Sequence, residues 1–540
     1  MNVLMVSIDR KILEEGSAVR ARMVEYGTIC DELHIIIPTH NLQFTRQNFA
    51  KQNLGGQATH NQRIQISENV FAYPAVGSNR IFTLFQVYRL GIRILATSYQ
   101  LPATSSLVTS QDPFETGFVA WLVARKTKAK LQLQIHTDFL SPYFVRGSLL
   151  NRIRVLLARF ILPRADGIRV VSERIKTSLS NVKCQMSNVS ILPIFIDAPK
   201  IMSAAPQFNL HKKYPQFDFI VLTTARLEPE KNITLALMAM KKVIAEYPRV
   251  GFIIVGSGSE MKNLKLKTID YRLKTSVIFA GWQDDLVSYY KTADLYISTS
   301  DYEGYGLSLA EAALSGCPIV TTDAGIAGSV LKEGVGAFIC PPRDANCLSG
   351  KVLKIIADKE LQKRLKRAAL AEVLGKVSKN KEEYLSEYKK TWEIKNKEGG
   401  QGGPVAREVF NFLISHRVAR YLMAGGAGAS VNLAALYFFT EYIGFYYLVS
   451  VAVAFFIAFA VSFTLQKFWT FKDKSTDNIH GQALMYLIVS VSTNFFLNIG
   501  LMYFFVDTLR VWYILAQVIS GGLIAMLNFI IYRNFIFRNR

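Results

Sequence analysis

The stretch that decides the fold of the larger part of this chain is DLYISTSDYEGYGLSLAEAALSGCP, residues 294–318. A short apolar run leads into a polar turn with two glycines, and an alanine-rich helical pattern follows. A strand that turns into a helix in this way is typical of parallel α/β proteins, which bind ligands at the carboxyl ends of their strands. We therefore expect a ligand site at this turn.

Two carboxylates, Glu303 and Glu311, flank the turn with seven residues between them. Gly304 and Gly306 allow the backbone to approach a ligand closely, and the helix that follows directs its unpaired N–H groups at an anion. Glu311 could then accept hydrogen bonds from a ribose, while Glu303 could face a reacting sugar. The alternative, that both glutamates lie on a solvated face, is disfavoured by the glycines and by the strand before them.

Outward from this stretch, residues 1–394 alternate short apolar runs with helical patterns, which predicts two doubly wound parallel sheets. The two halves meet near residues 200–215, where four prolines cluster. The strands expected in the first half are 2–8, 33–37, 106–109, 130–135 and 167–171. Those expected in the second half are 219–224, 251–255, 277–279, 295–297 and 318–321.

A second motif, TARLEPEKN at 224–232, lies at a strand end and opens a helix. Arg226 and Lys231, together with the helix dipole, could clamp a diphosphate. A purely structural role is equally compatible with this motif alone, because basic residues are common at strand ends.

The composition changes near residue 405. The 540 residues carry a formal net charge of +22, of which +17 belongs to residues 1–404 and +5 to 405–540. In the latter segment 86 of 136 residues are apolar, which excludes a purely soluble enzyme, a disordered chain and a disulfide scaffold. Five scattered cysteines without a CxxC pair predict reduced thiols and no zinc site.

The apolar segment predicts four membrane-spanning helices at about 418–440, 445–468, 483–506 and 511–533. Basic residues precede the first span, separate the second from the third and follow the fourth, so both ends of the segment are expected in the cytosol. The N-terminus lacks the basic start and long apolar run of a signal peptide, which agrees with a cytosolic position for residues 1–394.

An internal repeat recurs in this segment at an offset of 66 residues, giving expected repeats 409–474 and 475–540. The pattern KxWxFK at 467–472 recurs as RxFxFR at 533–538. Parallel repeats of this kind occur in transporters, although chance similarity between apolar segments is the alternative. Interface anchoring is the more frequent role of such basic–aromatic ends. The sharper hypothesis makes them sites for an anionic lipid phosphate, with the candidate ligands Lys467, Lys472, Arg533 and Arg538.

The elements that carry a specific family resemblance follow one another in this order: Arg226 and Lys231, VGSG at 255–258, FAGW at 279–282, AD at 293–294, the Glu303–Glu311 pair and Gly336. In these elements residues 1–394 resemble the retaining glycosyltransferases of family 4. The resemblance implies the α/β GT-B fold, with an acceptor-side Rossmann-like domain at 1–205 and a nucleotide-sugar domain at 206–394. It also implies a terminal helix near 377–392 that crosses back to the first domain.

The resemblance further implies a nucleotide-diphospho-sugar as co-substrate, with no cofactor and no metal, because Arg226 and Lys231 would stabilise the leaving diphosphate. It places His136, which closes a strand, against the donor sugar, although a lone histidine is more often structural. The implied catalytic residues are His136, Glu303, Arg226 and Lys231. The implied donor-binding residues are Gly16, Arg226, Lys231, Gly256, Gly304, Tyr305, Gly306, Leu307, Ser308 and Glu311.

Two departures from the family pattern bear on the mechanism. The loop after the first strand has only Gly16 where the family commonly has two glycines. The one carboxylate close to His136 in sequence is Asp138, so we expect front-face transfer rather than a covalent intermediate on Asp138.

The apolar segment, after a flexible linker at 395–408, resembles the GtrA-like membrane proteins over 409–540. The stretches that carry this resemblance are RYLMAGG at 420–426, SF at 462–463 and WTFK at 469–472. That family is linked to cell-envelope polysaccharide synthesis and is commonly proposed to handle polyprenyl-phosphate-linked sugars, so the resemblance implies a lipid-linked carrier.

Two basic–aromatic stretches, 80–93 and 144–164, remain outside these motifs. Basic amphipathic helices favour anionic membrane surfaces, and an ordinary half-buried helix is the alternative. No nucleic-acid-binding module is evident, so nucleic acid is not an expected partner.

The whole sequence therefore predicts a multi-pass inner-membrane hexosyltransferase with its catalytic part in the cytosol. It would move a sugar from a nucleotide donor to a lipid-linked acceptor, and a homo-oligomer is a further expectation. In the alternative reading the membrane part is a flippase for the lipid-linked product, and in a third the α/β part only senses nucleotide sugars.

Overall fold

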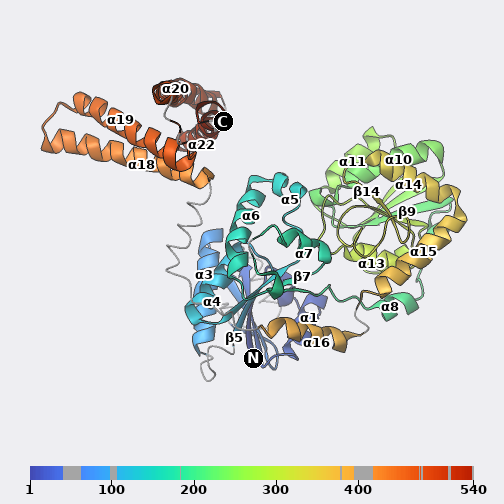
Figure 1. The fold of residues 1–540 in the computed structure, drawn as a ribbon. Coiled ribbons are helices and arrows are strands. Elements are labelled where there is room, and N and C mark those ends of the chain that lie inside the picture. The colour runs from blue at the N-terminus through green and yellow to red at the C-terminus, as the bar shows by residue number, and fades with distance from the viewer. Residues whose placement is uncertain are drawn as a thin grey trace. The chain divides into compact units, whose positions relative to one another are not determined.

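The computed structural model describes residues 1–39, 63–97, 106–182, 184–377, 380–394, 417–473, 475, 478–508 and 513–537. The chain divides into two compact units, Met1–Lys397 and Glu398–Arg540. The first unit contains two parallel sheets of eight and six strands, and the second is helical. Figure 1 shows the two sheets with their flanking helices.

The first sheet has the order β3-β4-β2-β1-β5-β6-β7-β8, in which only the β3–β4 pairing is antiparallel. Its strands are β1 Asn2–Val6, β2 Glu32–Thr39, β3 Ile64–Ser67, β4 Val70–Val76, β5 Ser106–Ser110, β6 Lys130–Ile135, β7 Gly167–Val170 and β8 Val189–Ile191. Its helices are α1 Ala18–Gly27, α3 Arg80–Thr97, α4 Glu115–Thr127, α5 Pro142–Gly147, α6 Leu149–Ile161 and α7 Glu173–Leu179. Helix α8 Ala198–Ser203, in the connection between the two halves, packs against the second half.

The second sheet has the order β11-β10-β9-β12-β13-β14, and all of its pairings are parallel. Its strands are β9 Phe219–Thr224, β10 Val250–Val255, β11 Val277–Gly281, β12 Leu295–Ser298, β13 Ile319–Thr322 and β14 Phe338–Cys340. Its helices are α9 Leu210–Lys213, α10 Ile233–Glu246, α11 Met261–Asp270, α12 Leu286–Thr292, α13 Leu307–Leu314, α14 Ala345–Ala357 and α15 Lys359–Leu374.

All ten strands that the sequence predicts are present, with ends that shift by at most two residues. Strands buried on both faces read as continuous apolar runs, as β1 and β10 do, and this made them recognisable. The sequence missed β3, β4, β8 and β14. Pro74 in β4 disfavoured a strand there, and β8 and β14 have only three residues each.

Helix α16, Lys381–Trp392, returns to the first half after α15 (Figure 1). Its Tyr384, Tyr388 and Trp392 are buried in the apolar core of the first sheet, where Tyr26 stacks on Tyr388 at 4.4 Å. The Gln132 side chain of β6 donates a hydrogen bond to the Thr391 carbonyl at 2.6 Å. The end of the second half is therefore part of the core of the first.

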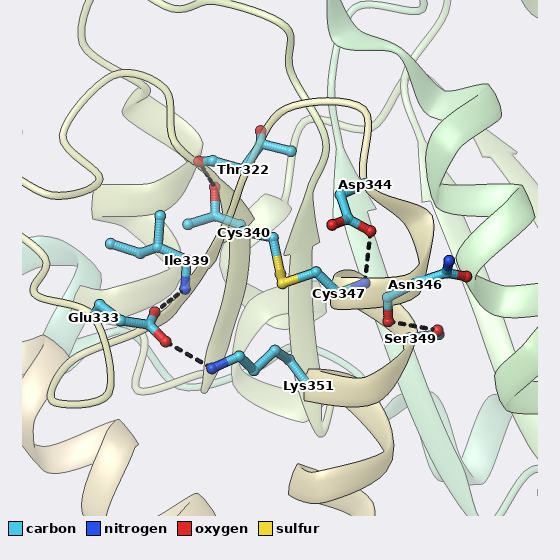
Figure 2. The surroundings of a disulfide bond; sticks show 10 residues. Thr322, Glu333, Ile339, Cys340, Asp344, Asn346, Cys347, Ser349 and Lys351 are labelled. Atoms are coloured by element: carbon cyan, nitrogen blue, oxygen red, sulfur yellow. Dashed lines mark hydrogen bonds and ion pairs between the residues drawn. A yellow bond between two sulfur atoms is a disulfide. The ribbon is translucent and has the colours of Figure 1, made fainter.

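The expectation that all five cysteines are reduced is wrong for two of them. Cys340 at the end of β14 and Cys347 in the first turn of α14 form a disulfide (Figure 2). The turn between them brings their Cα atoms to 5.8 Å, and Asp344 caps α14 by accepting a hydrogen bond from the Cys347 N–H. A disulfide between cysteines that are seven residues apart was not predicted, because CxxC pairs were the pattern sought in the sequence.

The helical elements of the second unit are α18 Arg417–Tyr437, α19 Tyr447–Thr464, α20 Ile479–Val491, α21 Asn498–Tyr503 and α22 Tyr513–Ile531, with the π-helical segments η6 Phe438–Tyr442, η7 Leu465–Thr470, η8 Ser492–Leu497, η9 Phe504–Thr508 and η10 Tyr532–Ile536. Among the described residues three helices are long and apolar enough to cross a membrane: Arg420–Tyr442, Ala452–Thr470 and Ile519–Ile536. The expected third span overlaps the shorter apolar helix Ile479–Val491, which η8 follows, and four spans remain a prediction.

The element bounds of this unit recur at the offset found in the sequence. Helix α21 ends and segment η9 begins 66 residues after α18 ends and η6 begins, and η10 ends 66 residues after η7. Aromatic side chains of α18, α19, α20 and η10 form its core, with Tyr421, Phe463, Tyr486 and Tyr532 among the buried residues.

Candidate active site

A cavity of about 320 Å³ lies where β9, β10 and β12 end, between the two halves of the first unit. The second half supplies most of its lining, and His136 and Ile194 from the first half complete it. The residues predicted from the sequence that line it are His136, Arg226, Lys231, Gly256, Glu303, Gly304, Tyr305, Gly306, Leu307, Ser308 and Glu311. The carboxyl ends of neighbouring parallel strands thus gather the predicted donor site at one edge of the sheet.

The turn between β12 and α13 contacts the first half directly. A Cβ atom added to Gly304 would lie 1.8 Å from the His136 carbonyl oxygen, so only glycine fits there. The Ser172 hydroxyl donates a hydrogen bond of 2.7 Å to the Gly304 carbonyl. Gly306, at φ +86°, then starts α13 with its first N–H groups at the cavity.

A salt bridge between Lys231 and Glu303, 2.5 Å from Nζ to Oε1, lies in the cavity wall. Both side chains are more than four-fifths buried, and the Ser300 hydroxyl donates a second hydrogen bond to Glu303 Oε1 at 2.8 Å. Asn232, in a left-handed conformation, donates to Asp301 Oδ1 at 3.0 Å and fixes the turn that carries Lys231. A partly desolvated ammonium group of this kind can bind a phosphate oxygen more strongly than an exposed one.

Arg226 differs from Lys231 although both belong to the same motif. Its side chain is 70% exposed and lies 3.6 Å from Glu230, which leaves the guanidinium accessible at the cavity. The fold therefore fixes the position of the Lys231 side chain, whereas the Arg226 side chain can change its conformation when a ligand binds.

Glu311 lies in α13 and accepts a hydrogen bond from the Tyr290 hydroxyl at 3.1 Å. Tyr290 is in turn 2.6 Å from the Thr224 hydroxyl at the end of β9. Burial raises the pKa of Glu311, and the Tyr290 hydrogen bond opposes this rise. The carboxyl group is held in one orientation at the cavity wall.

His136 follows β6 and borders two cavities at once. Burial lowers the pKa of His136 to about 3, and the positive charges of Arg169 and Arg22 add to this effect. The imidazole is therefore neutral near pH 7 and can donate one hydrogen bond and accept another.

A second cavity of about 840 Å³ adjoins the first and shares His136 and Ile194 with it. Residues of the first half make up most of its lining, including Arg80 of α3, Glu115 of α4 and Arg154 of α6. The two cavities thus meet at His136, where a group bound in one would face a group bound in the other.

Two residues discussed from the sequence lie elsewhere. Gly16, at φ +76°, is exposed and is absent from the lining of both cavities. Its loop is nevertheless near the site, because Lys11 lies 5.5 Å from the ring centre of Trp282, which lines the smaller cavity. Asp138 borders a third cavity of about 370 Å³ instead.

Sequence reasoning missed Trp282, Ile194 and the Arg343–Asp301 pair. Trp282 belongs to the FAGW motif, which was the available signal. Ile194 lies in the segment between the halves, where no pattern singled it out. Arg343 binds Asp301, two residues before Glu303, with 2.7 Å from Nη2 to Oδ2, and only the folded chain brings these two residues together.

The four lipid-phosphate candidates have different environments. Lys467 is fully buried and bonds Asp473 at 3.0 Å and Gln482 at 2.5 Å, which argues against a phosphate ligand there. Lys472 and Arg533 are exposed, and Arg538 lies outside the described residues.

Comparison with known proteins identifies two regions of the chain. Residues 207–371, which form the wall with Lys231, Glu303 and Glu311, match the family model "Glycosyl transferases group 1". Residues 420–537 match the model "GtrA/DPMS, transmembrane domain". The chain joins a group 1 glycosyltransferase domain to a GtrA/DPMS transmembrane domain.

Among the curated relatives of the glycosyltransferase part, two carry a lipid in their names, while others are named for glycogen, L-malate or poly(glycerol-phosphate). An alpha-monoglucosyldiacylglycerol synthase from Streptococcus pneumoniae is 28% identical over 237 residues, which are 42% of this chain and 53% of the relative. A UDP-Gal:alpha-D-GlcNAc-diphosphoundecaprenol alpha-1,3-galactosyltransferase from Escherichia coli is 26% identical over 179 residues, 32% of this chain and 46% of the relative. The chain thus spans about half the length of these relatives.

Among solved structures, Anabaena HepE in complex with UDP covers 73% of this chain and is covered completely, with a TM-score of 0.56 and 19% identity. Sucrose-phosphate synthase from Thermosynechococcus elongatus gives a TM-score of 0.59 at 17% identity, over 73% of this chain and 98% of that one. These similarities establish the GT-B-like two-sheet fold of the first unit.

Proposed function

We propose that this protein is a membrane-bound hexosyltransferase that moves a sugar from a nucleotide-diphospho-sugar to a lipid-linked acceptor in cell-envelope glycan synthesis. The observation that carries the proposal is the 320 Å³ cavity, whose wall joins Lys231, Glu303 and Glu311 inside the group 1 glycosyltransferase domain. The GtrA/DPMS domain and the relatives named for lipid acceptors support the choice of acceptor class.

The donor would occupy the smaller cavity with its diphosphate at Lys231, Arg226 and the N-terminus of α13. Fixed positive groups there stabilise the charge that develops on the leaving diphosphate. Glu311 would accept hydrogen bonds from the ribose, and Glu303 with neutral His136 would orient the sugar. In this scheme the two cations provide the charge that a metal provides in other enzymes.

The acceptor would approach from the larger cavity, which meets the smaller one at His136. In front-face transfer the bond from the sugar C1 to the phosphate oxygen breaks, and a bond from C1 to the acceptor oxygen forms on the same face. The acceptor proton passes to the leaving diphosphate oxygen. This front-face route is favoured over a covalent intermediate because Asp138 borders another cavity and Glu303 already binds Lys231.

Purified protein in liposomes tests this proposal when it receives labelled nucleotide sugars and either polyprenyl phosphate or diacylglycerol. We expect one donor to yield a lipid-soluble α-linked product, in amounts unchanged by EDTA. Failure of every donor would overturn the enzyme reading, a β-linked product would overturn retention, and EDTA inhibition would overturn metal independence.

The alternative is that the transmembrane domain moves the lipid-linked product across the bilayer, with the glycosyltransferase part as its loading enzyme. The recurrence of helix and π-helix bounds at 66 residues favours this reading, because transporters use such repeats. In the same liposomes, product accessible to a glycosidase on the trans side would support it. If the product stays on the side where it is made, the transmembrane domain only anchors the enzyme and does not move the lipid.

We also propose an inner-membrane position with the catalytic unit in the cytosol. A labelling reagent that cannot cross the membrane should modify an engineered cysteine at Lys241 only after the cells are lysed. Modification in intact spheroplasts would overturn this orientation.

A further inference from the structure

The outward sides of α3 and α6 group large apolar side chains that stay exposed in the part of the chain that the structure describes. On α6, Leu149, Ile153 and Leu156 lie on consecutive turns with 66%, 53% and 40% of their surface exposed. On α3, Ile81, Phe82 and Phe85 are exposed in the first two turns. Single exposed apolar residues are common, but grouped ones indicate a binding surface.

The same elements are strongly basic. Helices α3, α5 and α6 contain no acidic residue. Their seven arginines are Arg80, Arg89, Arg93, Arg146, Arg152, Arg154 and Arg159. Arginines interspersed among exposed leucine, isoleucine and phenylalanine match a surface that meets anionic head groups and the upper acyl chains together.

Helices α3 and α6 are joined in the lining of the 840 Å³ cavity by a carboxylate of α4. Arg80 and Arg154 both bond Glu115, with Nη2 to Oε1 at 2.6 Å and Nε to Oε1 at 3.1 Å. All three side chains line that cavity. The half-buried Asp112 also lines it, but its carboxylate already accepts hydrogen bonds from the Phe114 N–H and the Thr116 hydroxyl.

We propose that the face formed by α3, α5 and α6, here called the docking face, binds the surface of an anionic lipid bilayer. The exposed side chains of α3 and α6 would enter the head-group region, and the arginines that do not bond Glu115 would pair with lipid phosphates. The larger cavity would then open at the level of the lipid head groups, past Arg80 and Arg154. This last step rests on the proposed function, because it makes that cavity the acceptor site.

A bilayer fits this face better than a protein or a nucleic acid. The chain carries its own candidate membrane spans, so the first unit is tethered to a membrane by its sequence. A nucleic acid would gain nothing from the exposed Leu149, Ile153 and Leu156. Proteins bind its phosphates with positive charges, and they bind its bases by contacts in the grooves or by stacking on aromatic rings. An acidic protein partner is the remaining competitor, and a protein-free test removes it.

The test uses the full chain in nanodiscs, with Cys30 and Cys184 replaced by serine and an environment-sensitive fluorophore on a cysteine at Ile153 (Ile153→Cys). The matched control carries the label at Leu266 (Leu266→Cys), which is 62% exposed on α11, between Lys265 and Lys267. We expect the emission at 153 to move to shorter wavelength when phosphatidylglycerol is added to phosphatidylcholine. High salt should reduce the shift, and the label at 266 should not respond.

Equal responses at 153 and 266, or no response at 153 when phosphatidylglycerol is present, would overturn the proposal. A response at 153 that is the same in phosphatidylcholine alone would overturn the anionic preference.

This measurement needs no turnover, so it separates docking from the proposed function. A shift at 153 in a protein that uses no donor would leave docking intact and overturn the enzyme reading. For an active protein, Ile153→Glu should raise KM for the lipid acceptor severalfold without changing KM for the donor, and Leu266→Glu should change neither. An unchanged acceptor KM for Ile153→Glu would overturn the link between docking and acceptor entry.

Discussion

Each unit of this protein contains a lysine bonded to a carboxylate, and the two pairs differ in what surrounds them. Lys231 and Glu303 lie in the wall of a 320 Å³ cavity, and 15% and 17% of their side-chain surfaces remain exposed. Lys467 and Asp473 are 0% and 5% exposed, and Gln482 bonds both of them. The sequence marked both lysines as possible phosphate ligands.

The difference shows how an ion pair can be either a binding group or a structural one. Lys231 keeps part of its surface at a cavity, so a phosphate can share its ammonium group with Glu303. Lys467 already has its partners within the protein, and a charge buried so completely is stable only while those partners remain. Substitution of the first should therefore affect chemistry, and substitution of the second should affect folding.

The largest expected effect follows from replacing Lys231. Lys231→Ala should lower turnover by about 10²–10³-fold, the size seen when one fixed group that stabilises developing charge is removed. The substitution should leave the melting temperature nearly unchanged, because the cavity allows water to reach Glu303. Steady-state turnover and thermal unfolding measure the two quantities. Lys241→Ala, at an exposed position on α10, is the control, and normal turnover of Lys231→Ala would contradict the assignment.

The next effect concerns the stability of the membrane unit. Lys467→Met should lower its free energy of unfolding by about 3–5 kcal/mol, because Asp473 is left buried without its counter-charge. The double variant Lys467→Met/Asp473→Asn should recover most of the loss, since the asparagine side chain is neutral and can still bond Gln482. Unfolding in detergent measures both variants, and donor binding should not change. A Lys467→Met protein of normal stability that no longer binds lipid phosphate would restore the sequence-based hypothesis.

The contrast between the two lysines also marks what sequence could predict. Patterns of apolar runs predicted ten strands, and the family resemblance implied the helix that crosses back and the motifs that gather at the smaller cavity. These features depend on neighbours in sequence or on strand order. The burial of Lys467, the approach of Gly304 to His136 and the Cys340–Cys347 bond depend on distant or tightly folded chain segments. No local pattern encodes such contacts.

The docking face was predicted in part from the sequence. The sequence indicated basic–aromatic helices at 80–93 and 144–164, but it could not tell which side chains are buried. The structure places Val155 and Phe160 of α6 in the core and leaves Leu149, Ile153 and Leu156 outside. It also joins Arg80 to Arg154 through Glu115, across 35 and 39 residues of sequence.

A third prediction uses pH at the cavity that holds Lys231. Because burial lowers the pKa of His136 to about 3, the unfolded chain binds more protons than the folded one between that pH and about 6.5. The free energy of unfolding should therefore fall as the pH is lowered from about 6.5 towards 3. His136→Asn should remove this contribution, and the difference between the two proteins in acid denaturation measures it. Identical slopes for both proteins would show that folding does not lower the pKa of His136.

The smallest effect is expected at a third ion pair, whose cation is much more exposed than Lys231 or Lys467. Arg343 is 61% exposed while Asp301 is 9% exposed, and Asp301 also accepts the Asn232 hydrogen bond that fixes the turn carrying Lys231. Arg343→Ala should therefore cost at most about 1 kcal/mol of stability, as exposed pairs do. Its effect on kcat should be less than about tenfold, because it acts on the cavity only through Asp301 and the Lys231 turn.

Lys351→Ala supplies the matched control for this variant. Lys351 pairs with Glu333 near the disulfide (Figure 2), and neither residue lines the smaller cavity. Arg343→Lys should restore part of kcat if charge at Asp301 is what positions Lys231. Equal losses in Arg343→Ala and Lys351→Ala would instead mean that both pairs only stabilise the β14–α14 region. An ion pair would then influence the chemistry of this site only when it borders the cavity itself.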